Sequence, residues 1–163
     1  MKKILLLMTL TLVAFAATAQ KNMDGIIFGF KYHGNELHYR IWKDHVTVTS
    51  EVRSENFTKV VEIPSEVKYQ GKTYQVVGFE NYGIVGAKNV EKIIVPGSFR
   101  RVKLHSFKDC PDLRELVVQN GVESISGEPF ENCPKVKTVY IPASCEVTSE
   151  HWYKKKHVKL VRK

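Results

Sequence analysis

The chain has 163 residues, of which 43% are hydrophobic and 26% are charged. This composition excludes an intrinsically disordered protein, because enough apolar surface is present to form a buried core. The formal net charge of +8 favours acidic partners, and two of these charges belong to Lys2 and Lys3. No nucleic-acid-binding motif accompanies the basic residues, so we expect no nucleic-acid partner.

Residues 1–19 have the pattern of a secretory signal peptide. A positively charged start precedes an uncharged, mostly apolar run over residues 4–17, and Ala17-Thr18-Ala19 supplies small residues for cleavage before Gln20. The apolar run is shorter than the ~20 residues that a membrane helix needs, and no second run follows it. We therefore predict a secreted protein, which is periplasmic, cell-surface or extracellular and has no transmembrane anchor.

Residues 20–62 are predicted to form a β-rich N-terminal cap. Apolar and polar residues alternate along residues 37–42, which is the period of a half-buried strand, and residues 46–52 supply its partner after a turn at Lys43-Asp44. His33-Gly34-Asn35 indicates an earlier hairpin turn. A cap is physically required, because the end of a repeat array otherwise exposes its core.

A repeat with a period of 23 residues occupies residues 63–145. Its aligned apolar columns are Ile93, Leu116 and Val139; Val95, Val118 and Ile141; Phe79, Val102 and Ile125; and Ile84, Phe107 and Phe130. Such a period is typical of a solenoid, in which each unit packs against its neighbours. We expect one short strand from each unit in a parallel sheet, with Pro96 and Pro142 ending two of these strands.

The most regular unit runs from Val122 to Ser144 and includes Phe130-Glu131-Asn132-Cys133-Pro134 and Val139-Tyr140-Ile141-Pro142. This pattern resembles the BspA-like leucine-rich repeats of bacterial surface proteins. The positions that depart from the family pattern are Ile84, Ala87, Ser106 and Pro129. The resemblance implies a mainly β fold (a β-rich α/β solenoid) of about three leucine-rich repeats, and it implies adhesion to host proteins.

Residues 146–163 form a basic C-terminal segment. Its basic residues are Lys154, Lys155, Lys156, Lys159, Arg162 and Lys163. Two interpretations stay open: a solvated basic tail, or a C-terminal cap in which residues 157–162 add a closing strand through Val158, Leu160 and Val161.

The three cysteines are an odd number for an exported disulfide framework. Cys110 and Cys133 share one column with Ala87, and Cys145 shares another with Val122, so we expect all three thiols to act as small buried hydrophobes. Two alternatives remain, a disulfide between Cys110 and Cys133 and a cysteine hydrolase that also uses His105. Burial argues against the hydrolase, because it disfavours the nucleophilic thiolate.

Catalytic and metal-binding motifs are missing from the sequence. It contains no phosphate-binding glycine loop, no His-Glu-x-x-His and no Cys-x-x-Cys. His33, His38 and His45 are close enough along the chain for a metal site in a hairpin, although solvated histidines are the commoner outcome. We predict a protein that is not an enzyme and needs no cofactor.

The strongest candidates for function are strand residues that the core does not need. Their side chains are expected to point outward from the sheet, with an apolar row at Ile94, Val117 and Tyr140 among charged groups. The candidate binding residues are Lys92, Ile94, Arg114, Glu115, Val117, Lys137, Thr138 and Tyr140, with Glu91 beside them. An exposed aromatic residue among charges suits the recognition of a partner, and an ordinary sheet face is the alternative.

These features favour an exported binding module for a protein or glycan ligand. A structural component of the cell envelope is the second hypothesis, and self-association through a solenoid edge would serve either function. An exported enzyme or an enzyme inhibitor is a third, weaker hypothesis.

Overall fold

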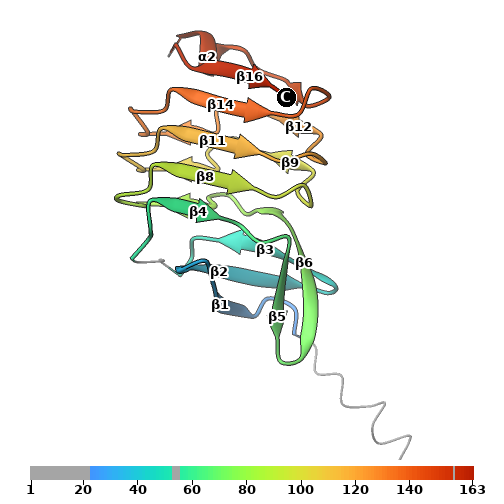
Figure 1. The fold of residues 1–163 in the computed structure, drawn as a ribbon. Coiled ribbons are helices and arrows are strands. Elements are labelled where there is room, and N and C mark those ends of the chain that lie inside the picture. The colour runs from blue at the N-terminus through green and yellow to red at the C-terminus, as the bar shows by residue number, and fades with distance from the viewer. Residues whose placement is uncertain (1–22, 53–55, 156) are drawn as a thin grey trace, which may run out of the picture.

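The computed structural model describes residues 23–52, 56–155 and 157–163 (Figure 1). The predicted signal peptide therefore lies outside the described residues. No helix within the described ranges is long and apolar enough to span a membrane. The described chain is almost entirely β-structure, arranged as a curled sheet at the N-terminal end and a stack of short parallel strands above it in Figure 1.

The N-terminal cap is a five-stranded sheet with the order β1-β2-β3-β6-β5. β1 (Ile27–Tyr32), β2 (Asn35–Trp42) and β3 (His45–Thr49) pair antiparallel, which confirms both predicted hairpins. The turn residue Lys43 has φ of 49°, and Gly34 has φ of 81°, values in the left-handed region that tight turns demand. β3 is shorter than expected, because Val52 lies beyond its end and is 43% exposed.

The chain passes through the solenoid sheet before it completes the cap. β4 (Val60–Glu62) pairs with the solenoid strand β8 (Lys92–Val95). β5 (Glu66–Tyr69) and β6 (Lys72–Phe79) then return to the cap, where β6 lies parallel to β3. The cap and the solenoid are therefore interleaved along the sequence between about residues 60 and 79.

The front wall of the solenoid is a parallel sheet with the order β16-β14-β11-β8-β4 (Figure 1). Its remaining strands are β11 (Glu115–Val118), β14 (Thr138–Ile141) and β16 (Lys159–Arg162). The register places Ile93, Leu116 and Val139 side by side, and all three are fully buried. The predicted mainly β solenoid with a 23-residue period is confirmed.

Two narrow sheets form the other walls, each built from two-residue strands. One has the order β13-β10-β7, from β7 (Ile84–Val85), β10 (Phe107–Lys108) and β13 (Phe130–Glu131). The other has the order β15-β12-β9, from β9 (Arg101–Val102), β12 (Ser124–Ile125) and β15 (Glu146–Val147). Phe107 stacks on Phe130 with ring centroids 5.6 Å apart, so the aromatic column fills the space between the walls.

A short helix and a strand close the C-terminal end. α2 (His151–Lys155) buries Trp152, whose ring meets Phe130 edge-on at 5.7 Å. β16 pairs with β14, so the predicted closing strand is confirmed. The Arg162 guanidinium donates hydrogen bonds to the carbonyl oxygens of Ala143 and Cys145, at 3.1 and 2.7 Å. The basic segment is thus an ordered cap in the part that the structure describes.

Candidate functional site

The outward face of the solenoid sheet carries two parallel rows of side chains. Strand register aligns Ile94, Val117, Tyr140 and Val161 in an apolar row, which we name the outer stripe. A polar row runs beside it through Lys92, Glu115, Thr138 and Lys159. All residues of the outer stripe are half-buried, since each packs against its neighbours in the stack while one side faces solvent.

Tyr140 is the most distinctive residue of the outer stripe. The ammonium group of Lys163 lies 4.2 Å from the centre of its ring, a cation–π contact that orients the phenol. A shallow groove of about 440 Å³ lies beside Tyr140 and is lined also by Val117, Gln119, Asn120 and Lys163. Tyr140 therefore presents a fixed aromatic surface at the rim of a groove.

Most of the predicted binding residues come together on this face. Lys92, Ile94, Glu115, Val117, Thr138 and Tyr140 share it, and the Lys92 ammonium lies 3.3 Å from the Glu115 carboxylate. Arg114 and Lys137 are exposed but precede β11 and β14, so they lie at the entrance to the strands and outside both rows. Glu91 similarly precedes β8 and pairs with Lys59 at 3.1 Å.

Sequence reasoning missed Val161 and Lys163 as parts of this surface. Val161 continues the outer stripe by one strand, and Lys163 covers the Tyr140 ring. The 23-residue period places the next strand two residues too late, because β16 follows β14 after 21 residues, as the pairing of Val139 with Leu160 shows. The apolar alternation at Val158, Leu160 and Val161 was the available signal.

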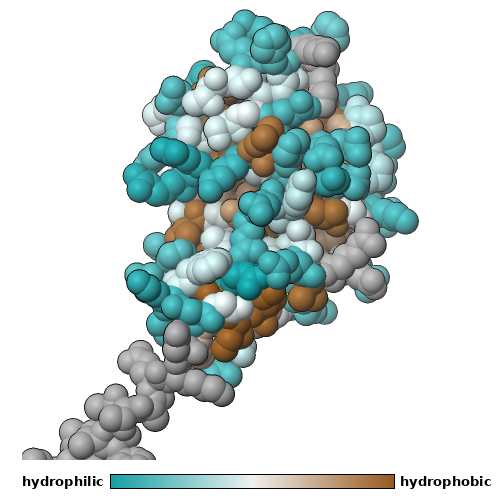
Figure 2. Space-filling view, turned by 180° about the vertical axis from the view of Figure 1, so that it is seen from behind, coloured by the Kyte–Doolittle hydropathy of each residue, from teal (hydrophilic) through white to brown (hydrophobic). Residues whose placement is uncertain are grey.

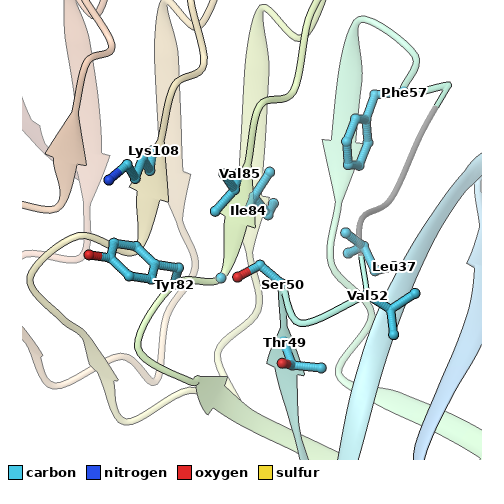
Figure 3. Close-up of a pocket in the computed structure, with 10 residues that line it drawn as sticks. Leu37, Thr49, Ser50, Val52, Phe57, Tyr82, Ile84, Val85 and Lys108 are labelled. Carbon is cyan, nitrogen blue, oxygen red and sulfur yellow. The ribbon is translucent and has the colours of Figure 1, made fainter.

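A second concavity, which we name the junction pocket, lies where the cap meets the first solenoid unit (Figure 3). Its volume is about 380 Å³, and it is lined by Leu37, Thr49, Ser50, Val52, Phe57, Tyr82, Gly83, Ile84, Val85 and Lys108. The Lys108 ammonium lies 5.1 Å from the centre of the Tyr82 ring and 2.8 Å from the Glu131 carboxylate, and this hydrogen bond raises the pKa of Lys108. Sequence reasoning missed this pocket, because its residues come from five separate segments.

The rear surface is mainly hydrophilic, with separate hydrophobic patches (Figure 2). Large hydrophobic side chains that are exposed in the described ranges are Trp42, Val52, Val60, Tyr82 and Leu104. Val52 and Tyr82 belong to the junction pocket, whereas Trp42 donates a hydrogen bond from its indole to Thr47 at 3.0 Å.

The cysteines are free thiols within the core. Cys110, Cys133 and Cys145 are all buried. The neighbouring Cys133 thiol and burial together raise the pKa of Cys110 far above its ordinary value. A thiol in this state is a poor nucleophile, so the geometry supports the predicted core role and gives the cysteine-hydrolase hypothesis no activated group.

Two histidines of the N-terminal hairpins, His33 and His45, are paired with a nearby acid. His33 lies 2.9 Å from Glu62, and His45 lies 3.0 Å from Asp44. Across the described residues, no group of three or more His, Cys, Asp or Glu side chains is placed to hold a metal ion. His105 pairs with Glu131 at 3.1 Å on the wall opposite the outer stripe.

Comparison with known proteins places the chain among bacterial repeat proteins. The family model described as the BspA type leucine rich repeat region matches residues 49–159, with six copies. A leucine-rich repeat protein from Bacteroides capillosus is 18% identical, with a TM-score of 0.62 over 83% of this chain and 98% of that one. The pneumococcal vaccine antigen PcpA is 14% identical, with a TM-score of 0.53 over 87% of this chain and 39% of that one. Comparison with curated protein sequences found no relative.

Proposed function

Because the chain belongs to the BspA-type leucine-rich-repeat family, we propose that it is an exported binding module that recognises a protein or glycan at a bacterial cell surface. Adhesion to a host matrix protein is the form of recognition that we favour. The segment predicted to direct export is residues 1–19. The module acts by surface complementarity and carries out no chemical reaction.

The observation that carries this proposal is the continuous outer stripe from Ile94 to Val161. The inward side chains of each strand form the solenoid core, whereas the outward apolar residues keep one side exposed to solvent, where a partner can contact them. Tyrosine is enriched at the energetic centres of interfaces, where a rigid ring supplies a large contact area. Tyr140 has this character, because Lys163 fixes its ring beside a groove.

The size of the face limits the affinity of a single module. Five strands spaced ~4.8 Å apart, each about 13 Å long, cover roughly 300 Å² in projection. A standard protein interface buries about 800 Å² on each partner. We therefore expect modest affinity for one module, and we expect the ligand to be narrow or repetitive enough to follow the outer stripe.

The test is binding of residues 20–163 to an array of host matrix proteins and anionic glycans. The array is probed at about 0.15 M and about 0.5 M salt, because higher salt screens contacts between surface charges. We expect a hit that persists at the higher salt and that Tyr140→Ala weakens about tenfold or more, as for a central interface tyrosine. Tyr32→Ala, on the half-buried Tyr32 of the cap, is the matched control and should leave binding unchanged.

Each other outcome counts against recognition through the outer stripe. A hit that disappears at the higher salt assigns binding to the basic C-terminal segment. Equal binding by Tyr140→Ala and by the unmodified protein places the ligand elsewhere. The absence of any hit, together with homotypic association in sedimentation, favours the structural role in the envelope.

A further inference from the structure

The two edge strands of the solenoid sheet, β4 and β16, differ in how their outward backbone groups are covered. At the edge formed by β4, the carbonyl oxygen of Val60 accepts hydrogen bonds from the side chains of Asn35, at 2.9 Å, and Thr58, at 2.7 Å. Glu62 on the same strand pairs with His33. Side chains of the cap hairpin thus satisfy and cover this edge.

The opposite edge is formed by β16, which pairs with β14 and with no further strand in the part of the chain that the structure describes (Figure 1). The backbone of Lys159 and Lys163 bonds to β14, through Lys159 N–H to the Lys137 carbonyl at 2.7 Å and Lys163 N–H to the Ile141 carbonyl at 2.9 Å. Alternation along a strand therefore directs the N–H and C=O groups of Leu160 and Arg162 away from the sheet. Such a row of outward backbone groups is a template for a further strand.

Most ion pairs between neighbouring coils run in the same direction. Among the described residues, four of the five Lys or Arg pairs place the cation on one coil and the acid on the following coil, and Lys135 with Asp112, at 2.7 Å, is the reverse. The four pairs are Lys59 with Glu91 at 3.1 Å, Lys92 with Glu115 at 3.3 Å, Arg100 with Glu123 at 3.2 Å, and Lys108 with Glu131 at 2.8 Å. Lys159 occupies the position of Lys92 on the last strand, is exposed, and has no acidic partner among the described side chains.

The strand β16 also repeats the pattern of β8 in its first three residues. β8 begins Lys92-Ile93-Ile94 and is followed in the stack by Glu115-Leu116-Val117. β16 begins Lys159-Leu160-Val161, with Leu160 in the inward column and half-buried, and no strand of the described residues pairs with its outer edge. A strand with the pattern acidic–apolar–apolar would pair with Lys159, cover Leu160 and extend the outer stripe.

We propose that the open edge of β16 is a docking site for an extended segment of a partner protein with the pattern acidic–apolar–apolar, which adds to the sheet as a further parallel strand. Backbone hydrogen bonds to Leu160 and Arg162 supply affinity, and the acid opposite Lys159 supplies specificity. A second copy of this chain is a poor occupant, because two such edges would bring Lys159 and Arg162 of each copy together. This site goes beyond the proposed function, since it uses the sheet edge and not the outer stripe.

The probe is a labelled peptide with the sequence of residues 112–120, which contains the strand that naturally follows β8. Binding to residues 20–163 is measured by fluorescence anisotropy, and amide hydrogen exchange reports the N–H groups of Leu160 and Arg162. We expect saturable binding that slows exchange at both groups. Lys159→Glu should weaken binding about five- to tenfold, because it replaces an ion pair by repulsion.

Three controls separate this docking from general charge attraction. A peptide with Glu115→Lys should bind the unmodified protein poorly and should recover affinity for the Lys159→Glu variant. A peptide with Val117→Pro should lose binding, because proline cannot donate to the edge. Lys103→Glu, an exposed substitution on another wall, should have little effect.

The proposal is overturned if the proline peptide binds as well as the original, or if Lys103→Glu weakens binding as much as Lys159→Glu. Absence of peptide binding also overturns it, and self-association that depends on Lys159 would assign the edge to a second copy. Tyr140→Ala should leave peptide binding intact, so failure here is distinguishable from failure of the outer stripe.

Discussion

At the scale of single residues, the backbones of neighbouring coils approach each other closely at Gly97. A Cβ atom added there would lie 1.9 Å from the carbonyl oxygen of Asn120 on the next coil. A Cβ atom at Gly121, whose φ is 111°, would lie 2.4 Å from the carbonyl oxygen of Gly97. The corner after β8 therefore has no room for a side chain at Gly97, and the two coils would have to separate to accept one.

We expect Gly97→Ala to lower the free energy of unfolding by about 1–3 kcal/mol, the usual cost of overpacking a close contact. Gly78→Ala is the matched control, because a Cβ atom there meets nothing within 4 Å. The control should be neutral or stabilising by up to about 1 kcal/mol, through the lower entropy of its unfolded chain. Urea unfolding gives the free energy of unfolding of both variants. Equal values for the two would mean that the coils separate at Gly97 without loss of stability.

The Cys110 thiol makes stability depend on alkaline pH. Its pKa is raised in the folded protein by the Cys133 thiol and by burial, so the folded chain keeps a proton that the unfolded chain loses above about pH 8.5. The free energy of unfolding must then fall as the pH rises, by up to about 1.4 kcal/mol per pH unit for this thiol. Below about pH 8 both states are protonated and the effect is absent.

We therefore expect Cys110→Ala to lose less stability than the unmodified protein between about pH 8.5 and pH 10. Urea unfolding at several pH values measures the two slopes. Val122→Ala, a buried substitution without a titrating group, should lower stability equally at each pH. Parallel curves for Cys110→Ala and the unmodified protein would contradict the buried, protonated state.

At the scale of elements, the short helix α2 of the C-terminal cap is anchored by Trp152. α2 is too short to be stable alone, since isolated helices need about 12–15 residues. Trp152 is 3% exposed and packs edge-on against Phe130 at 5.7 Å and Tyr153 at 5.2 Å. Burial of this indole ring must therefore hold α2 against the end of the stack.

Trp152→Ala should lower the free energy of unfolding by about 3–5 kcal/mol, as expected for a buried aromatic residue. Trp42→Ala is the comparison, because Trp42 is 44% exposed at the β2–β3 hairpin, and it should cost far less. Thermal or urea unfolding gives both values. Similar losses for the two variants would mean that α2 contributes little to the end of the solenoid.

The elements that could be predicted from the sequence are those governed by local periodicity. Alternation and the 23-residue period indicated β8, β11 and β14, and the same alternation predicted which of their side chains form the outward rows. α2 could not be predicted, because its five residues form no amphipathic repeat and fold only against Phe130. The junction pocket was also beyond sequence reasoning, since its lining residues lie far apart in the sequence, from Leu37 in β2 to Lys108 in β10.

At the scale of the whole molecule, β6 joins the cap to the solenoid. It pairs with β3 in the cap sheet, while its last residue, Phe79, lies edge-on to Phe99 at 4.9 Å and to Phe107 at 5.3 Å in the solenoid core. The hydroxyl of Ser98 also donates to the carbonyl oxygen of Val76 at 2.6 Å. The two parts share one core, so we expect them to unfold together.

The two tryptophans allow this cooperativity to be measured, because Trp42 lies in the cap and Trp152 lies at the far end of the solenoid. Variants that carry Trp152→Phe or Trp42→Phe each leave one fluorescent reporter. Circular dichroism gives the change in stability that each substitution causes by itself. After correction for this change, we expect the two fluorescent reporters to give the same urea midpoint.

Phe79→Ala should uncouple the two reporters, because it removes the ring that bridges the two parts of the core and costs about 3–5 kcal/mol. Phe28→Ala is the control, since Phe28 stacks on Tyr69 at 4.4 Å within the cap alone. It should lower both midpoints together, because the contacts between the cap and the solenoid are intact and the two parts still unfold as one unit. Different midpoints for the two reporters in the absence of Phe79→Ala would mean that the cap folds independently of the solenoid. Phe79→Ala would then lower only the midpoint of the solenoid reporter.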